Sequence, residues 1–435
     1  MSNIFQQFID NLSISNSEEI SKSYNEITKR LNKDFWDLES DETKHSLQVG
    51  SYGRKTAIKG VSDLDMVFEL PNGLYNKYDN YETNGQSQLL QAVKSALLVK
   101  YPKTDIKGDG QVVVVNFNRY RVEVLPAFLQ EDNSYIFPDT HDGGSWKACN
   151  PRAEMSAINN LNSNSNGNLK KVCKMLRTWK DNAGAPMSGM LIDTLTYKFF
   201  DNNHSYDDKS LASYPQLITD VFSYLTNLEH KEYWLAPGSL SRVYSTGNFH
   251  RKVKKATQKC QDALDQDDDT KKVKIWKEIF GMQFPASNTA TAKMSLESSY
   301  SNANLRKNTE EFIGIKFPLD ITYDLEIECS VDYAGKNERR YRAFEKTFPW
   351  LQLNRNLEFK IAGTNVPEPY DIYWKVRNVG GYAERNNQIR GQILQGGNRQ
   401  KEHTSFGGSH YVECYIIKNG YCVARDLIDV PIGDL

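Results

Sequence analysis

The sequence predicts an α+β fold in three successive parts, and three changes of pattern along the chain support this prediction. Strand-like and helix-like segments interleave over residues 1–150, the pattern over 151–317 is mainly helical, and residues 318–435 form short alternating segments. Gly, Asn or Pro separates these last segments, as is typical of strands joined by tight turns. We therefore expect a mixed part, a helical part and an all-β, sandwich-like part in this order.

The first part begins with a predicted helix. Its apolar residues recur at spacings of four and three: Ile20, Tyr24, Ile27, Leu31 and Phe35. Residues 61–70 and 111–128 are rich in β-branched and aromatic side chains, which predicts strands. A helix is predicted between them over 86–102, so strands and helices interleave.

The second and third parts differ in their hydrophobic period. Residues 168–182 and 187–202 predict helices, and the Asn/Ser-rich run over 159–168 predicts a loop. In the third part, Asn419 and Gly420 lie between two alternating segments, and this dipeptide favours the type I′ turn of a β-hairpin.

Composition excludes several classes of protein. The 435 residues carry 54 basic and 55 acidic side chains, so no overall charge favours a long nucleic acid or a membrane surface. The six cysteines form no CxxC pair, which disfavours a zinc site or a disulfide framework and suits a reducing compartment. No stretch approaches the roughly 18 apolar residues of a membrane-spanning helix. We expect a cytoplasmic protein.

Acidic side chains gather on the two predicted strands. Asp63 and Asp65 are two residues apart, so their carboxylates lie on one face of a strand. Glu123 lies in an alternating strand whose opposite face is apolar, which makes it the best candidate for a third carboxylate. Two Mg²⁺ ions need several such hard oxygen ligands held close together. The alternatives are a solvent-facing Asp-Leu-Asp and a structural ion pair of Glu123 with Arg119 or Arg121.

Four segments resemble one family. GSYGRKTAIKGVSDLDMVFEL (50–70), YRVEVLPAF (120–128) and MLRTWKDNAGAPMSGMLIDTL (175–195) resemble the nucleotidyltransferases of the DNA polymerase β-like superfamily. More closely, they resemble the bacterial CD-NTases, relatives of cyclic GMP-AMP synthase and oligoadenylate synthetase that act in CBASS anti-phage defence. The C-terminal segments, including HYVECYIIKNGYCVARD (410–426), are similar to the adenylyl/guanylyl and SMODS C-terminal sensor domain.

The resemblance implies roles for the acidic cluster and for the turn before it. Gly50 and Ser51 would hold the triphosphate, since backbone N–H groups and a hydroxyl in such a turn suit phosphate oxygens. Asp63 and Asp65 would bind two Mg²⁺ ions, or Mn²⁺ in their place, and Glu123 would ligate the metal that activates the attacking hydroxyl. Many relatives carry Asp at this third position. Glu69, further along the first strand, is the alternative third ligand.

The helix over 168–182 carries basic residues on one side. Lys170, Lys174 and Arg177 are three to four residues apart. The resemblance implies that a basic residue of this helix contacts the triphosphate, with Lys174 the first candidate and Arg177 the second. The alternative is a solvated basic face. Ser188 matches a small polar position near the phosphates.

Base recognition is assigned to aromatic residues. A nucleobase of ATP or GTP can stack on Tyr233 or Tyr244, in a segment that also contains hydroxyl groups and an arginine. Tyr52 and Gln111 are further candidates for contacts with the nucleotide. The alternative is that these aromatic side chains pack between helices.

The resemblance implies that the third part senses a ligand. The candidates are Trp374, Arg377, Asn378 and Arg390, because aromatic and guanidinium groups suit an anionic or nucleotide-like ligand. The alternative is that Trp374 fills the sandwich core and the arginines lie on its rim.

These observations predict a Mg²⁺-dependent nucleotidyltransferase that joins nucleoside triphosphates into a cyclic or short linear oligonucleotide. This messenger would activate a downstream effector protein. Two alternatives remain: the same fold could add nucleotides to RNA or to a protein, or a catalytically silent chain could act as a nucleotide sensor.

Overall fold

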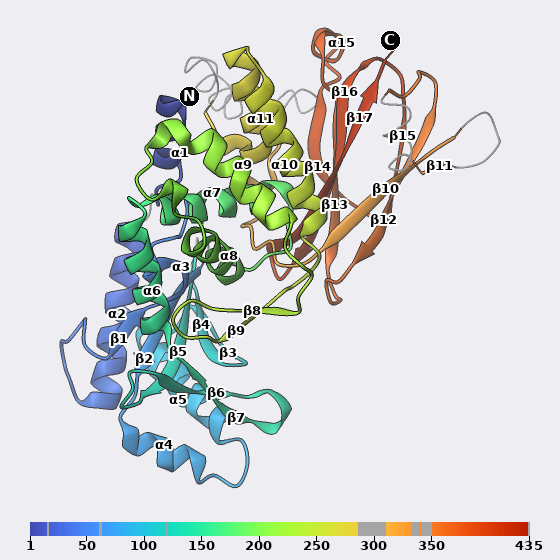
Figure 1. Ribbon diagram of the computed structural model, residues 1–435. Helices are drawn as coiled ribbons and strands as arrows, with labels where there is room; N and C mark the ends of the chain where they lie inside the picture. The colour runs from blue at the N-terminus through green and yellow to red at the C-terminus, as the bar shows by residue number, and fades with distance from the viewer. Residues whose placement is uncertain are drawn as a thin grey trace.

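The computed structural model describes residues 1–14, 17–60, 63–118, 120–285, 310–332, 339–340 and 350–433. Figure 1 shows an N-terminal sheet with helices, a helical region at one end of it, and a C-terminal all-β region beside the helical region. The predicted α+β class with an all-β C-terminal region is therefore confirmed. Within the described ranges, no helix is both long enough and apolar enough to cross a membrane.

The N-terminal region is a seven-stranded sheet with the order β1-β2-β5-β4-β3, extended from β5 by β6 and β7. Strands β2 and β5 are parallel neighbours, and the other pairings are antiparallel. The strands are β1 (Ser46–Gln48), β2 (Asp63–Glu69), β3 (Asp105–Asp109), β4 (Val112–Asn116), β5 (Arg121–Leu129), β6 (Tyr135–Asp139) and β7 (Ser145–Cys149). The helices are α2 (Ser17–Trp36), α3 (Gly50–Gly53), α4 (Asn72–Asp79), α5 (Gly85–Lys100) and the 3-10 turn η1 (His141–Gly143).

One face of this sheet is apolar and is covered by α2 and α5. Alternation along β2 and β5 turns Leu64, Met66, Val122 and Val124 into the core formed with these two helices. The polar residues between them therefore lie on the opposite face of the sheet, which determines where the candidate site lies.

The helical region contains α6 (Pro151–Asn164), α7 (Asn168–Ala183), α8 (Gly189–Asp201), α9 (Tyr214–Thr226), α10 (His250–Asp265) and α11 (Asp269–Phe280), with the hairpin β8 (Tyr233–Leu235) and β9 (Arg242–Tyr244). Short 3-10 turns are η2 (His204–Tyr206), η3 (Leu211–Ser213) and η4 (Gly281–Gln283). The N-terminal helix α1 (Ser2–Asn11) also packs here, because Phe5 and Phe8 contact Trp276 and Phe280 of α11.

One sequence prediction in these regions is confirmed and one was wrong. Residues 111–128, predicted to be strand, form the antiparallel pair β4 and β5. Residues 159–164, predicted as part of a loop, continue α6, because Ile158 and Leu161 are buried one turn apart while the asparagines occupy the other faces. Composition concealed this helix, since its apolar period rests on few residues.

Among the described residues of the C-terminal region, the strands form two four-stranded sheets, with the orders β11-β10-β12-β15 and β14-β13-β16-β17. Its strands are β10 (Leu325–Val331), β11 (Arg339–Arg340), β12 (Asn356–Thr364), β13 (Asp371–Arg377), β14 (Arg390–Gly396), β15 (Arg399–His403), β16 (Gly408–Lys418) and β17 (Tyr421–Ile432), and its short helices are α13 (Ile313–Lys316) and α15 (Gly381–Arg385). Phe359 and Trp374, from different sheets, share one core, so the sheets pack as a sandwich. The predicted hairpin turn is confirmed: Asn419 and Gly420 both have positive φ, as a type I′ turn requires.

Candidate active site

The structure brings the three sequence-predicted carboxylates onto neighbouring positions of two parallel strands. In the pairing of β2 with β5, Asp65 is opposite Glu123, and Asp63 is opposite Arg121. All four residues alternate with core residues and lie on the sheet face away from α2 and α5. The third carboxylate is thus adjacent to the two aspartates, as the sequence predicted.

Arg121 lies between two of these carboxylates. Its Nη2 donates a hydrogen bond to Asp63 Oδ2 at 3.0 Å. Its Nε lies 2.9 Å from Glu123 Oε1, at an angle that makes this an ion pair without a hydrogen bond. The sequence offered an ion pair of Glu123 with Arg121 as a structural alternative. This ion pair is present, and Glu123 is at the same time the register partner of Asp65. Arg119, the other predicted partner, lies outside the described residues.

Burial and mutual repulsion raise the pKa values of two carboxyl groups in this cluster. Burial raises the pKa of Asp65 to about 6, and the neighbouring charge of Asp63 adds to the effect, while Arg54 and Arg121 oppose it. Burial also raises the pKa of Glu123 to about 7, with Asp65 adding to the shift and Arg121 opposing it. A cation placed among these groups would favour their ionised forms.

The short helix α3 fits closely against this cluster. Val49 N–H donates to the Asp65 carbonyl at 2.9 Å, and Gly50 follows with φ of +59°. A Cβ on Gly50 would lie 1.8 Å from Asp65 Oδ2, so only glycine leaves room for the carboxylate. Ser51 is half-buried in the same turn. The GSYG segment therefore meets the aspartates directly.

Carboxylates of this kind suit a divalent cation, but they are not arranged as a complete coordination shell. Asp63, Asp65 and Glu123 supply the hard oxygen donors that Mg²⁺ and Mn²⁺ prefer. Across the described part of the chain, however, no group of three or more His, Cys, Asp or Glu side chains is arranged to hold a metal ion. The donors fit in kind, and Arg121 fills the position between Asp63 and Glu123.

A buried ionic network joins the GSYGR segment to the helical region. Asp193 Oδ2 of α8 accepts hydrogen bonds from Arg54 Nε at 2.8 Å, from Thr56 Oγ1 at 2.8 Å and from Arg177 Nη2 at 2.7 Å. Burial alone would raise the pKa of Asp193, but Arg177 and Arg54 hold it below its usual value. Sequence analysis missed Arg54 and Asp193, because a buried ionic centre leaves no periodic signal.

The basic residues of α7 divide into two groups. Arg177 is buried, and its Nη2 also donates to the Gly189 carbonyl at 2.8 Å, so it holds α7 against α8. Lys174 is half-buried, and burial alone lowers its pKa. Burial also lowers the pKa of Lys170, and the nearby charges of Lys55 and Lys174 add to that effect. The three lysines thus form a cationic cluster beside the GSYGR segment, and Lys55 is an addition to the prediction.

The remaining candidates near the sheet have local partners. Ser188 is the N-cap of α8, where its Oγ accepts a hydrogen bond from Leu191 N–H at 3.1 Å. Gln111 Nε2 donates to Asp139 Oδ2 at 3.3 Å. Tyr52 is half-buried, and its hydroxyl has no hydrogen-bond partner in the described part of the chain. Burial raises the pKa of Tyr52 to about 12, with the charge of Asp63 adding to the effect. Tyr52 is therefore close enough to the carboxylates for the charge of Asp63 to affect it.

Glu69, the alternative third ligand, is separated from the cluster. It is opposite Ala127 in the strand pairing, four residues beyond the Glu123 position. Its Oε1 accepts hydrogen bonds from Tyr135 Oη at 2.6 Å and from Arg152 Nη2 at 2.9 Å. The geometry therefore favours Glu123.

The two tyrosines proposed for base stacking face each other on the β8–β9 hairpin. Tyr233 and Tyr244 are register partners, with ring centroids 5.9 Å apart. The guanidinium of Arg242 lies 4.6 Å from the centroid of the Tyr233 ring. Tyr244 is 50% exposed, so its ring remains accessible.

The residues proposed to bind a ligand in the C-terminal region have different surroundings, the sandwich core for Trp374 and a cavity for Asn378 and Arg390. Trp374 is buried in the sandwich, and its Nε1 donates to the Gly397 carbonyl at 2.8 Å, as the structural alternative predicted. Arg377 Nε donates to Glu310 Oε2 at 3.1 Å. Asn378 and Arg390 line a cavity of about 400 Å³.

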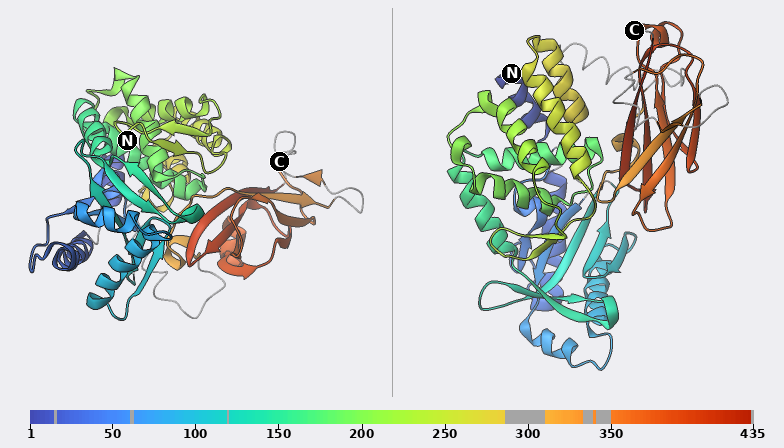
Figure 2. Two further views of the ribbon diagram at one scale, coloured as in Figure 1. Left: turned by 90° about the horizontal axis from the view of Figure 1, so that it is seen from below. Right: turned by 45° about the vertical axis from the view of Figure 1, so that its right-hand side comes forward.

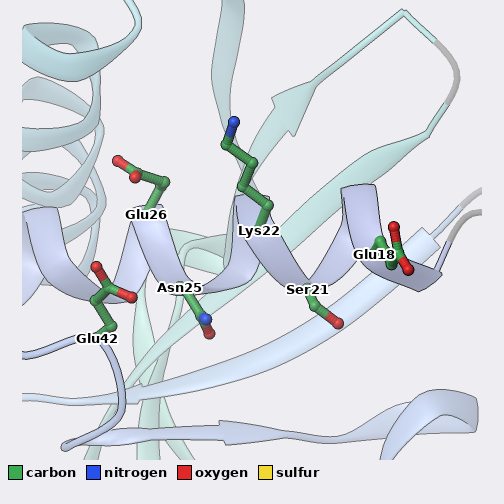
Figure 3. A pocket seen from close by; sticks show the side chains of 6 residues that line it. All are labelled: Glu18, Ser21, Lys22, Asn25, Glu26 and Glu42. Carbon is green, nitrogen blue, oxygen red and sulfur yellow. The ribbon is translucent and has the colours of Figure 1, made fainter.

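A second hollow lies along α2, on the other side of the sheet from the carboxylate cluster. It has a volume of about 430 Å³. Figure 3 shows its side chains projecting in different directions from the helix and the segment after it: Glu18, Ser21, Lys22, Asn25, Glu26 and Glu42. Because α2 covers the apolar face of the sheet, opposite the carboxylates, this hollow is not part of the candidate site.

Comparison with known families and structures matches both ends of the chain. Residues 1–162 match the family described as the Second Messenger Oligonucleotide or Dinucleotide Synthetase (SMODS) domain. Residues 307–433 match the Adenylyl/Guanylyl and SMODS C-terminal sensor domain.

Two curated relatives each match more than half of the chain. The chain is 25% identical over 323 residues to a cyclic AMP-AMP-AMP synthase from Acinetobacter sp., which corresponds to 69% of this chain and 92% of that protein. It is 21% identical over 283 residues to a probable cyclic nucleotide synthase from Bacillus cereus, covering 56% of this chain and 83% of that protein. The fold is similar to that of E. coli MS115-1 CdnC solved with ATP, with a TM-score of 0.50 and 15% identity over 65% of this chain and 98% of that chain.

Proposed function

We propose that the chain is a CD-NTase, with a SMODS domain followed by a C-terminal sensor domain, and that it joins nucleoside triphosphates into a cyclic oligonucleotide second messenger. One observation carries the chemistry. Asp65 and Glu123 are register partners on parallel strands, Asp63 is two residues before Asp65, and the glycine of the GSYG turn is packed against them. This arrangement concentrates carboxylates where a triphosphate-binding turn ends.

The side chains divide the work of nucleotidyl transfer. Asp63, Asp65 and Glu123 would hold two Mg²⁺ ions, with Mn²⁺ as a substitute. When bound, these ions lower the pKa of the attacking ribose hydroxyl and neutralise the departing pyrophosphate. Gly50 and Ser51 orient the triphosphate. Because Lys174 is half-buried, its ammonium group is poorly hydrated and available to an anionic group.

Arg177 and Ser188 would support the site without contacting the nucleotide. The guanidinium of Arg177 is held by Asp193 and Gly189, and Ser188 caps α8, so both would position the helices that line the site. Tyr233 and Tyr244 supply the rings for base stacking, at the exposed end of the β8–β9 hairpin.

The substrates are nucleoside triphosphates, with ATP as the first candidate, because the curated relative from Acinetobacter sp. is a cyclic AMP-AMP-AMP synthase. We place the reaction in the cytoplasm, where these substrates are formed, in anti-phage signalling through an effector that binds the product. The cavity beside Asn378 and Arg390 is our candidate for the ligand of the sensor domain.

The test compares the full chain with an Asp63→Asn/Asp65→Asn variant, which keeps side-chain size and removes two charges. Both are incubated with labelled NTPs and Mg²⁺ or Mn²⁺, and phosphatase-resistant products are separated. We expect a cyclic product from the unmodified chain alone, and omission of single NTPs then identifies its bases. A product that needs added RNA or protein would instead support a transferase to that acceptor. Equal NTP turnover by both proteins would contradict the proposal.

A further inference from the structure

A tyrosine of the C-terminal region lies directly over the arginine of the candidate active site. Tyr421 is the first residue of β17, immediately after the Asn419-Gly420 turn. The guanidinium of Arg121 lies 4.9 Å from the centroid of the Tyr421 ring, within the range of a cation–π contact. The same guanidinium pairs with Asp63 and Glu123. The tip of the β16–β17 hairpin therefore contacts the arginine that pairs with two of the carboxylates.

A second group of the C-terminal region acts on the same cluster. Asp320 N–H donates to the Cys422 carbonyl at 2.9 Å, which places Asp320 beside the start of β17. Its charge acts electrostatically on Arg121 and on Glu123. Figure 2 (right) shows the lower end of the C-terminal strands approaching the strands of the N-terminal sheet. The contact is thus a junction between two regions that are far apart in the sequence.

Arg121 lies between two of the carboxylates that a divalent cation would use. The guanidinium engages one oxygen each of Asp63 and Glu123, and its positive charge beside them opposes the binding of a Mg²⁺ or Mn²⁺ ion to the same carboxylates. An arginine is always charged and binds carboxylates well, so it is a competent competitor. The ring of Tyr421 stabilises the arrangement in which Arg121 holds Asp63 and Glu123.

Resting on the proposed function, we propose that Arg121 is a positioning residue that competes with the divalent cation for Asp63 and Glu123, and that Tyr421 strengthens this competition. The C-terminal region thereby lowers the affinity of the catalytic carboxylates for metal. The β16–β17 hairpin has its other end at the cavity, where Tyr411, Val412 and Val430 contribute to the wall. The same pair of strands therefore reaches both the cavity and the carboxylates.

The test measures metal affinity without turnover. Mn²⁺ is titrated into the full chain in the absence of nucleotide, and free Mn²⁺ is followed by electron paramagnetic resonance. In Tyr421→Leu, which removes the ring, we expect affinity to rise by about 2- to 30-fold, the range that a cation–π contact supplies. Tyr421→Phe keeps the ring and removes only the hydroxyl, which also interacts with Arg121, so its Mn²⁺ affinity should rise less than that of Tyr421→Leu.

Two further variants guard against a trivial result. Arg121→Met removes the competing charge at its source and should raise the affinity at least as much as Tyr421→Leu. Tyr373→Leu is the matched control, because Tyr373 is another half-buried C-terminal tyrosine beside a cation, with Lys316 Nζ 5.6 Å from its ring centroid. It should leave Mn²⁺ affinity unchanged. Circular dichroism reports whether each variant is folded.

The outcomes separate this inference from the proposed function. If Mn²⁺ binding is abolished by Asp63→Asn/Asp65→Asn but is the same in Tyr421→Leu, Arg121→Met and the unmodified chain, the competition is absent and the inference is wrong. A weaker affinity in Tyr421→Leu or Arg121→Met also overturns it, because the cluster would then support the metal. If none of these folded proteins shows binding that depends on the two aspartates, the metal centre of the proposed function fails.

Discussion

At the scale of single residues, the protonation of Asp65 and Glu123 links metal binding to pH. In the folded protein without metal, the pKa values of these groups are raised to about 6 and about 7. The ionised forms are the metal ligands, so a cation that binds near neutral pH must displace protons.

We therefore predict that Mn²⁺ binding tightens as pH rises from about 6 to 8, by up to about tenfold per pH unit for each proton released. Mn²⁺ titration at several pH values measures this directly, and calorimetry in buffers of different ionisation enthalpy counts the protons. An affinity that is flat over this range would contradict the prediction.

The same shifts have an opposite consequence for the metal-free chain. Because the pKa values are raised in the folded state, folded protein binds more protons than unfolded protein between about pH 4 and 7. The contribution of these two groups to stability therefore grows as pH falls from about 7 towards 4, and is lost as pH rises through the folded pKa values. Added Mn²⁺ should reverse this trend.

The sequence located the charged groups of the site and not their partners. The spacing of Asp63 and Asp65, and the alternation around Glu123, follow from the two-residue period of a strand, which can be seen without a structure. Asp193 is an acidic residue in the interior of a mainly apolar helix, and its burial beside Arg54 depends on tertiary packing. No local pattern encodes such a pair.

At the scale of elements, the fit of α3 against β2 makes a sharp prediction. In Gly50→Ala, the new Cβ would meet Asp65 Oδ2 at 1.8 Å, and alanine would have to adopt a φ of +59°. The backbone cost is about 1–2 kcal/mol, which a folded chain can tolerate. The Asp65 carboxylate has to turn away, so we expect at least about a tenfold loss of Mn²⁺ affinity, by the measure that about 1.4 kcal/mol is tenfold.

Gly73→Ala is the control for this substitution. Gly73 lies on α4, and a Cβ there would meet nothing within 4 Å. Mn²⁺ titration and thermal unfolding of both variants separate lost metal affinity from lost stability. If Gly50→Ala binds Mn²⁺ as tightly as Gly73→Ala does, the carboxylate does not depend on the glycine.

The elements also show where pattern recognition succeeds. The helix α2 and the β16–β17 hairpin follow strong local rules, an apolar period and an Asn-Gly turn, and both are observed. The helix α6 does not, because its Asn- and Ser-rich faces look like a loop when its two buried apolar residues are ignored. Its N-cap, Asn150, accepts a hydrogen bond from Ala153 N–H at 3.0 Å and was the signal that could have identified the helix start.

At the scale of the whole molecule, the C-terminal region must be held in place for Tyr421 to reach Arg121. Part of that attachment is a buried ion pair between Lys252 of α10 and Asp426 of β17. Asp426 Oδ2 also accepts a hydrogen bond from Ile327 N–H of β10 at 3.0 Å. The ion pair therefore lies where α10 meets the sandwich strands β10 and β17. No sequence rule connects residues 252 and 426, since the pairing arises only when the helical region and the C-terminal region assemble.

We predict that Lys252→Met weakens this junction strongly. It removes a cation that is paired with the buried Asp426 carboxylate, while Arg251 Nη2 stays 3.5 Å away, and such a loss costs about 3–5 kcal/mol. The matched control is Lys255→Met, on the same helix, which breaks the exposed pair with Asp429 at 2.8 Å and should cost at most about 1 kcal/mol. Differential scanning calorimetry should show the larger downward shift for Lys252→Met.

This substitution also bears on the metal site. A C-terminal region that is loosened at Asp426 should hold Tyr421 less firmly over Arg121, so Mn²⁺ affinity should rise in Lys252→Met and stay unchanged in Lys255→Met. Equal effects of the two substitutions on the calorimetric transition would show that the buried pair does not hold the junction. A destabilised Lys252→Met with unchanged Mn²⁺ affinity would show that the junction and the carboxylates are independent, because the hairpin tip would then keep its place without this anchor.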